Sequence, residues 1–147
     1  MVITIFHLGV SYPLEIPRAA RIVEVKMEIE KIFDMPPVKM DLAYNAVWLR
    51  RDELTLLDYQ IPSGAKLILY KKFRVWIRID PYRRYSLMVN DDTTVGDLKE
   101  MFHADSGLHI MRSNLQYPKD HDLNEGCFLW SYGISDESEV YIDHLWL

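Results

Sequence analysis

Hydrophobic and polar positions along the chain follow two periods, and the first is that of β-strands. Residues 1–8 and 12–16 are rich in β-forming side chains and flank a turn at 9–11, which predicts a β-hairpin. Pro13 has no N–H to donate to a neighbouring strand, so we expect the second run to lie at a sheet edge. Later apolar runs predict three more strands, at residues 42–44, 47–49 and 66–70.

The second period is that of an α-helix. Apolar residues recur at spacings of three and four between residues 22 and 32, which places them on one helix face. None of residues 18–21 is a Ser, Thr, Asp or Asn, so the start of this helix is predicted to be poorly capped. Pro36 and Pro37 end the helix, because the residue before a proline is kept out of the α region.

The same succession of patterns begins again at residue 73, almost without a linker. Residues 73–79 alternate, and residues 85–89 are predicted to pair back on them. Thr94 and Asp97 have capping-box spacing at the start of a second helix, and Gly107 can provide its left-handed stop. Two further strands are expected, at residues 115–117 and 139–142.

The two halves therefore read as an internal duplication. Leu129–Ile134 has the same pattern as Leu56–Ile61, at a period of 73 residues. We predict two domains, residues 1–72 and 73–147. Each is expected to be a mixed sheet packed on one helix, which is an α+β arrangement.

The order of these parts resembles that of ubiquitin. A hairpin, a helix, Pro36-Pro37, short strands and the run Thr55-Leu56-Leu57-Asp58-Tyr59-Gln60-Ile61 follow one another as they do in that family, and the second half repeats the order less closely. The whole chain thus resembles the tandem ubiquitin-like proteins, among them the interferon-induced two-domain modifier. The resemblance implies two tandem β-grasp domains, and it implies fold more strongly than function.

Covalent conjugation is one function that the resemblance raises. Ubiquitin is conjugated through a C-terminal Gly-Gly, whereas the last glycine here is Gly133 and no two glycines are adjacent. Two positions that carry common polyubiquitin linkages hold Val47 and Ser63. We therefore expect a protein that is not conjugated, with a covalent modifier matured from a longer precursor as the alternative.

Noncovalent recognition through an apolar patch is the other function that the resemblance implies. In the first domain the matching positions are Leu8, Ala43 and Tyr70, with Ile68 beside them, and Val47 and Trp48 are expected to enlarge the patch. We predict that this patch binds a partner, with packing against the second domain as the alternative. The matching positions in the second domain are polar, which disfavours an apolar partner there; they are Asp80, Gln116 and Asp143.

Two other features of the second domain suggest partners. Arg83 and Arg84, with Arg74 and Arg78, predict a basic cluster on its hairpin. Domains of the Ras-association type use such residues against GTPases, so GTPase binding is an alternative function, as is a structural role in a larger complex. The terminal Leu145-Trp146-Leu147 is expected either to fold back onto the second sheet or to serve as a docking peptide.

Composition narrows the classes of function. Residues 1–72 carry 10 Lys+Arg and 9 Asp+Glu, a net charge of +1, whereas residues 73–147 carry 7 and 13, a net charge of −6. An acidic chain disfavours nucleic-acid binding, and no apolar run approaches the ~20 residues of a membrane span. The single cysteine, Cys127, allows no internal disulfide and is expected to be a buried thiol, so we expect a cytoplasmic or nuclear location.

Catalytic chemistry finds little support in the motifs. The five histidines have no zinc-ligand spacing with one another or with the cysteine, and there is no glycine-rich phosphate loop. We therefore predict a protein that is not an enzyme and has no metal or other cofactor. Its expected role is that of a protein-binding adaptor or ubiquitin mimic, acting as a monomer or as a subunit of a complex, with readers or enzymes of the ubiquitin pathway as partners.

Overall fold

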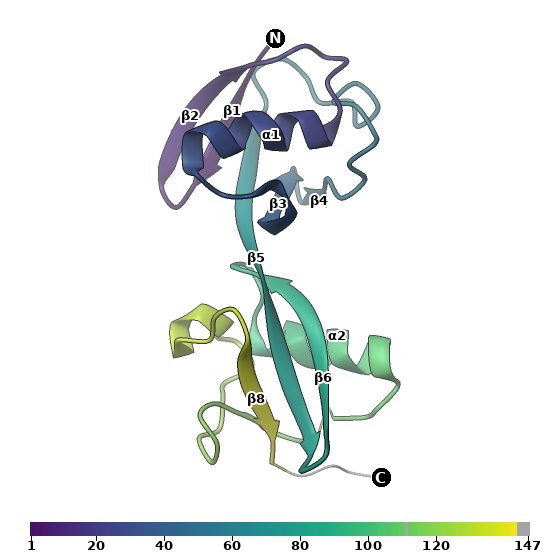
Figure 1. Cartoon of the computed structure of the whole chain (residues 1–147), viewed down its shortest axis with the longest axis vertical. Coiled ribbons are helices and arrows are strands. Elements are labelled where there is room, and N and C mark those ends of the chain that lie inside the picture. The colour runs from purple at the N-terminus through teal and green to yellow at the C-terminus, as the bar shows by residue number, and fades with distance from the viewer. Residues whose placement is uncertain (111, 144–147) are drawn as a thin grey trace. The chain divides into compact units, whose positions relative to one another are not determined.

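The computed structural model describes residues 1–110 and 112–143 of the chain (Figure 1). It divides into two compact units, Met1–Lys71 and Lys72–Leu147, called here the first and the second unit. The predicted roles of Leu145-Trp146-Leu147 lie outside the described residues. None of the helices in the described part is long and apolar enough to cross a membrane.

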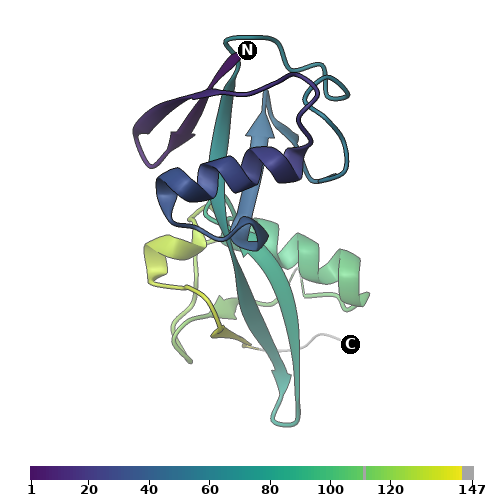
Figure 2. The ribbon, with the colours of Figure 1, turned by 45° about the horizontal axis from the view of Figure 1, so that its top comes forward.

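The first unit is a mixed sheet with one α-helix. Strand β5 pairs in parallel with β1 and antiparallel with β3, in the strand order β2-β1-β5-β3-β4. Figures 1 and 2 show α1 crossing one face of this sheet. The elements are β1 (Val2–His7), β2 (Val10–Glu15), α1 (Ile22–Phe33), a 3₁₀ turn η1 (Pro37–Lys39), β3 (Met40–Tyr44), β4 (Val47–Trp48) and the first part of β5 (Lys66–Asp80).

Alternation along the strands and the helical period meet in one core. Ile3 and Ile5 of β1 and Leu67 of β5 are fully buried, and they pack with Val25 and Ile29 of α1. Burying one such side chain stabilises the fold by about 1.5–3 kcal/mol. The predicted α+β arrangement of the first unit is thereby confirmed.

The hairpin of the first unit is tighter than predicted. Leu8 and Gly9 both have positive φ, 48° and 80°, and form a two-residue turn. Such turns match the right-handed twist of the flanking strands, so β2 begins at Val10 and not at residue 12. Pro13 lies on β2, which among the described strands pairs with β1 alone, so its predicted place at a sheet edge is confirmed.

The ends of α1 explain why its start looked weak in sequence. Arg21 is the N-cap, and it has no side-chain acceptor for the free backbone N–H groups of the first turn. Glu24 supplies half of a capping box, because its Oε1 accepts from the Arg21 backbone N–H at 3.3 Å. At the other end Asp34 adopts the left-handed conformation, with φ of 53°.

The second unit repeats this order of elements. Its strands pair β6 with β5, β5 with β8 in parallel, and β8 with β7. Thr94 and Asp97 form the predicted capping box, and Gly107 ends the helix at φ 77°. The elements are the last part of β5, β6 (Arg83–Asn90), α2 (Val95–Ser106), β7 (Leu115–Gln116), η2 (Leu129–Tyr132) and β8 (Ser138–Ile142).

The core of the second unit is also formed by apolar residues of its strands and its helix. Val75 and Ile77 of β5 and Val140 of β8 are fully buried, and they pack with Leu98 and Phe102 of α2. Cys127, expected to be buried, is instead partly exposed.

Two hydrogen bonds within the first unit recur within the second unit, between residues that lie 73 positions later in the sequence. The buried Lys26 donates to Asp52 at 2.8 Å, and the buried Lys99 donates to Glu125 at 2.5 Å. The Tyr59 hydroxyl accepts from a backbone N–H at 3.1 Å, and the hydroxyl of Tyr132 accepts likewise at 2.9 Å. One set of side-chain contacts therefore occurs in both units.

Candidate functional site

The sheet of the first unit has an outer face, turned away from α1, on which several predicted site residues meet. Pairing places Ala43 opposite both Trp48 and Ile68, and Ile68 opposite Phe6 on β1. Tyr70 follows two residues after Ile68 on the same side of β5. These five apolar and aromatic residues are called the aromatic face below.

The aromatic face is built around two rings. The centroids of Trp48 and Tyr70 lie 5.3 Å apart, with the ring planes tilted by 60°. Aromatic pairs at this distance add about 0.5–1.5 kcal/mol beyond the area that they bury. Ala43 is only 7% exposed, so it forms the floor of the face and not a contact point.

Cations border the aromatic face. The guanidinium of Arg50 lies 4.6 Å from the Trp48 ring centroid, and it forms a two-pronged ion pair with Asp41 at 2.9 and 3.3 Å. The Lys66 ammonium lies 4.1 Å from the centroid of Phe6. Lys66 thus places positive charge beside the apolar surface, whereas the charge of Arg50 is offset by Asp41, and such a face suits a partner with apolar and acidic side chains.

The other two predicted members of the patch are Leu8 and Val47. Leu8 lies on the β1–β2 turn and is 80% exposed, and its part in the patch stays a prediction. Val47 pairs with Tyr44, one residue along from the Ala43–Trp48 pair, so the alternation of the strand turns it to the opposite side. The expectation that Val47 enlarges the patch together with Trp48 is therefore wrong.

The outer face of the second unit's sheet carries charges around one tryptophan. The guanidinium groups of Arg74 and Arg84 lie 5.0 and 3.8 Å from the Trp76 ring centroid. The indole N–H of Trp76 donates to Glu137 at 2.8 Å, and Arg74 pairs with the same carboxylate at 2.7 Å. The hydrogen bond from Trp76, followed by that from Arg74, lowers the pKa of Glu137.

A second carboxylate on this face is paired in the same way. Arg78 hydrogen-bonds to Glu139, and this bond lowers the pKa of Glu139. Arg84 lies 3.8 Å from the same group. Arg74, Arg78 and Arg84 of the predicted basic cluster therefore have their positive charge partly offset by Glu137 and Glu139.

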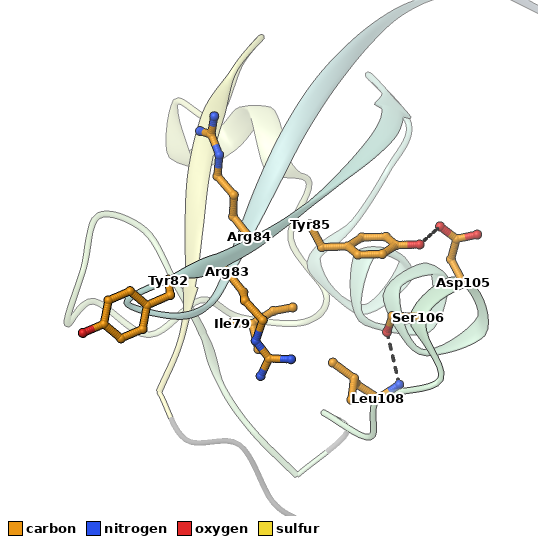
Figure 3. Close-up of a pocket in the computed structure, with 8 residues that line it drawn as sticks. All are labelled: Ile79, Tyr82, Arg83, Arg84, Tyr85, Asp105, Ser106 and Leu108. Carbon is orange, nitrogen blue, oxygen red and sulfur yellow. Dashed lines mark hydrogen bonds between the residues drawn. The ribbon is translucent and has the colours of Figure 1, made fainter.

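Arg83 separates from that cluster. The β5–β6 pairing shifts register between Arg78 and Asp80, and Arg83 forms an ion pair with Asp80 at 2.8 Å. Figure 3 shows the guanidinium groups of Arg83 and Arg84 pointing in opposite directions. The prediction of one cluster containing both arginines is therefore wrong.

Arg83 and Arg84 border a shallow hollow of about 720 Å³ between β6 and the end of α2 (Figure 3). The Tyr85 hydroxyl donates to Asp105 there, which raises the pKa of Tyr85. The other lining residues are Ile79, Tyr82, Ser106 and Leu108.

The predicted polar positions of the second unit make local contacts. Asp80 accepts backbone N–H groups of Tyr82 and Arg83, both at 2.9 Å, and its pKa is lowered mainly by the side-chain bond from Arg83. Gln116 donates to Asp122 at 2.8 Å. Asp143 accepts the backbone N–H of Asn114 at 2.8 Å. These side chains stabilise turns and strand ends.

Three residues on or beside the first unit's outer face were not predicted as site residues from the sequence. Phe6 occupies the exposed phase of an alternating strand whose other phase holds Ile3 and Ile5. That phase was a usable signal. Arg50 and Lys66 are brought to the rings only by the tertiary fold.

Within residues 1–110 and 112–143, no group of three or more His, Cys, Asp and Glu side chains is placed to hold a metal ion. His103 and His109 do approach each other, with ring centroids 4.4 Å apart. A pair of imidazoles supplies fewer ligands than a structural zinc site uses.

Comparison with known proteins addresses the first unit. Residues 3–74 match the family model described as Ubiquitin family. The chain contains a ubiquitin-like domain. Among curated proteins, none matches the chain. The comparisons leave the resemblance to tandem modifiers, and the nature of the second unit, as predictions.

One solved structure similar to the chain is the ubiquitin-like domain of an Arabidopsis thaliana protein, determined by NMR. Its sequence is 20% identical, the match covers 48% of this chain and 76% of that one, and the TM-score is 0.47.

Proposed function

We propose that the protein is a noncovalent protein-binding adaptor made of two ubiquitin-like domains, residues 1–72 and 73–147, and that it mimics linked ubiquitin. The recurrence of the Lys26–Asp52 pair as Lys99–Glu125 supports a second ubiquitin-like domain. A buried lysine paired with an acid is an uncommon feature, and finding it twice at one spacing favours a common origin of the two units.

The aromatic face carries the functional proposal. Trp48 and Tyr70 stand on a rigid sheet, and their rings lie 5.3 Å apart over the small side chain of Ala43. Tryptophan, tyrosine and arginine dominate the energy of protein interfaces, and Arg50 lies against the Trp48 ring. Readers or enzymes of the ubiquitin pathway that offer apolar anchors flanked by acidic groups fit this face.

A pull-down with two matched variants tests the proposal. The Trp48→Ala, Tyr70→Ala double variant removes both rings, whereas Val47→Ala truncates an exposed residue of the same hairpin on the other side of the sheet. Proteins recovered by the wild type and by Val47→Ala, and lost by the double variant, are the expected result. Equal recovery by all three proteins would refute a binding role for the face.

GTPase binding by the second unit is a second candidate, favoured by one observation. Arg74, Arg78 and Arg84 share one face of its sheet, as a partner with acidic switch regions requires. Their pairing with Glu137 and Glu139 lowers the positive potential on which such a partner depends. Arg84→Glu, with Arg83→Glu as the control on the other side of β6, tests this role with a panel of GTP-loaded small GTPases.

The remaining parts of the proposal concern setting and chemistry. We place the protein in the cytoplasm or nucleus, as a monomer or as a subunit of a complex, without a catalytic role. Incubation with a ubiquitin-activating enzyme and ATP tests the covalent alternative, because a modifier would form a thioester that reducing agent cleaves. Co-purification of a stoichiometric partner tests the structural-subunit alternative.

A further inference from the structure

The second unit exposes a stacked pair of large aromatic rings. The ring centroids of Phe128 and Trp130 lie 5.9 Å apart, and the ring planes are 13° from parallel. Phe128 is 38% exposed and Trp130 57% exposed, whereas Leu129 between them is fully buried. The two rings are called the aromatic shelf below.

Local backbone geometry produces the aromatic shelf. The turn η2 directs Leu129 into the core, so its neighbours on either side point outward. The backbone is held firmly there, because the Leu129 N–H donates to the Thr93 carbonyl at 3.0 Å and the Ser131 hydroxyl donates to the Phe128 carbonyl at 2.6 Å. The core and the hydrogen bonds account for Leu129, but they give no reason for aromatic rings at the two outward positions.

The first unit provides a comparison at the same positions. Thr55 and Leu57 lie 73 residues before Phe128 and Trp130, and Leu56, which precedes Leu129 by the same number, is likewise fully buried. Thr55 has a structural task, because its hydroxyl accepts the Asp58 backbone N–H at 3.0 Å. The second unit has an exposed ring at the position where the first unit has this small polar residue.

The surroundings of the aromatic shelf are acidic. An isolated bridge pairs Phe128 with Thr94, directly before α2, and Asp97 accepts the Thr94 backbone N–H at 3.0 Å, so the Asp97 carboxylate lies near the Phe128 end of the shelf. Asp92 and Asp97 are both exposed, and the pKa of Asp92 is raised first by burial and then by the charge of Asp97. Residues 73–147 as a whole carry a net charge of −6. The potential beside the rings therefore favours cations.

We propose that the aromatic shelf is a docking surface for a basic segment of a partner protein, with a Lys or Arg side chain lying across the Trp130 ring. A cation over an indole ring is attracted by the electron-rich face of the ring, and the aliphatic stem of the same side chain covers apolar surface. Asp92 supplies the complementary charge. This surface lies in the other unit from the aromatic face and does not depend on the proposed function.

Titration of the full chain with two designed peptides tests the proposal. The basic probe is Gly-Arg-Leu-Arg-Leu-Arg-Gly, and the acidic probe has Glu in place of each Arg. Backbone and indole N–H signals of the ¹⁵N-labelled protein are followed by NMR at low and at high salt. Shifts centred on residues 127–132 and on the Trp130 indole, with the basic probe alone and weakened by salt, are the expected result.

Variants separate the aromatic shelf from general charge attraction. Trp130→Ala is expected to weaken binding of the basic probe about tenfold, and Leu57→Ala, at the matching position of the first unit, to leave it unchanged. Asp92→Asn is expected to weaken binding by a few-fold, and Asp34→Asn, an equal charge change in the first unit, is not. The spectrum of each free variant shows whether the fold is retained.

Four outcomes would overturn the proposal. The first is equal binding of the two probes, and the second is no binding of the basic probe at millimolar concentration. The third is a set of shifts centred on the Arg74–Trp76–Arg84 stack or on the aromatic face. The fourth is self-association of the wild type in sedimentation that Trp130→Ala abolishes, because the shelf would then be covered by a second copy of this chain.

Discussion

The Lys99–Glu125 pair, in which only the lysine is buried, predicts an unequal response to removing its two partners. The Lys99 side chain is 2% exposed and donates to Glu125 at 2.5 Å, whereas the Glu125 side chain is 56% exposed. Glu125→Ala leaves an ammonium group inside the unit without its carboxylate. Lys99→Met instead removes the charge, keeps most of the volume, and leaves a carboxylate that water can solvate.

The magnitudes follow from burial. Breaking a fully buried ion pair costs about 3–5 kcal/mol, and a hydrogen bond to a charged group contributes about 1.5–3 kcal/mol. Because half of the carboxylate is already in water, we expect Glu125→Ala to destabilise the second unit by about 2 kcal/mol. Lys99→Met is expected to cost less than about 1 kcal/mol, and the double variant to resemble Lys99→Met alone.

Hydrogen exchange of core amides measures the loss of stability in each unit separately. The equilibrium constant for opening of the second unit, measured at the Phe102 amide, is expected to rise roughly 30-fold in Glu125→Ala. The factor follows from the loss of about 2 kcal/mol, since 1.36 kcal/mol is a factor of ten. Asp52→Ala should do the same at Ile29 in the first unit, where Asp52 pairs with Lys26. A cost of Lys99→Met equal to that of Glu125→Ala would refute the reasoning, as would a cost of Glu125→Ala below about 0.5 kcal/mol.

Three further predictions concern stability. Asp34 and Gly107 end the two helices in the left-handed conformation, so Asp34→Gly should stabilise the first unit and Gly107→Ala destabilise the second, each by about 0.5–1 kcal/mol in urea unfolding. Phe102→Ala should destabilise the second unit by about 3–5 kcal/mol, because the ring is fully buried, and a smaller cost would mean that the site collapses. The pKa of Glu137 is lowered below its usual 4.5, so its contribution is present above that pH and is lost as pH falls through the lowered pKa. Thermal melts of Glu137→Gln should therefore lie below the wild type at pH 7 and converge with it under acid, and a constant gap would contradict this.

The elements were predictable where one short-range pattern decides them. The three-and-four spacing of Val25 and Ile29 gave a helix because it forms one apolar face, and the Thr94–Asp97 box marked the start of the second helix. The β1–β2 turn was misplaced because the pattern allows either a three-residue loop or a two-residue one. Only a left-handed conformation at Leu8, which apolar residues rarely adopt, distinguishes them.

The candidate site was less predictable because it depends on the side of the sheet that each residue faces. Trp48 and Val47 are neighbours in sequence, but pairing with Ala43 and Tyr44 turns them to opposite sides. Arg83 and Arg84 are likewise consecutive residues of β6, so the alternation of the strand turns them to opposite sides. A one-residue change in register inverts the facing of every side chain in a strand, and composition carries no information about it.

Chemical-shift mapping tests the central claim, that the aromatic face binds proteins. The ¹⁵N-labelled chain is titrated with purified ubiquitin-binding modules, and the titration is repeated with Val47→Ala and with Trp48→Ala, Tyr70→Ala. The account predicts shifts centred on Ala43, on Trp48 with its indole, and on residues 68–70, retained in Val47→Ala and lost in the double variant. An absence of shifts with every module, or shifts that survive loss of both rings, would contradict it.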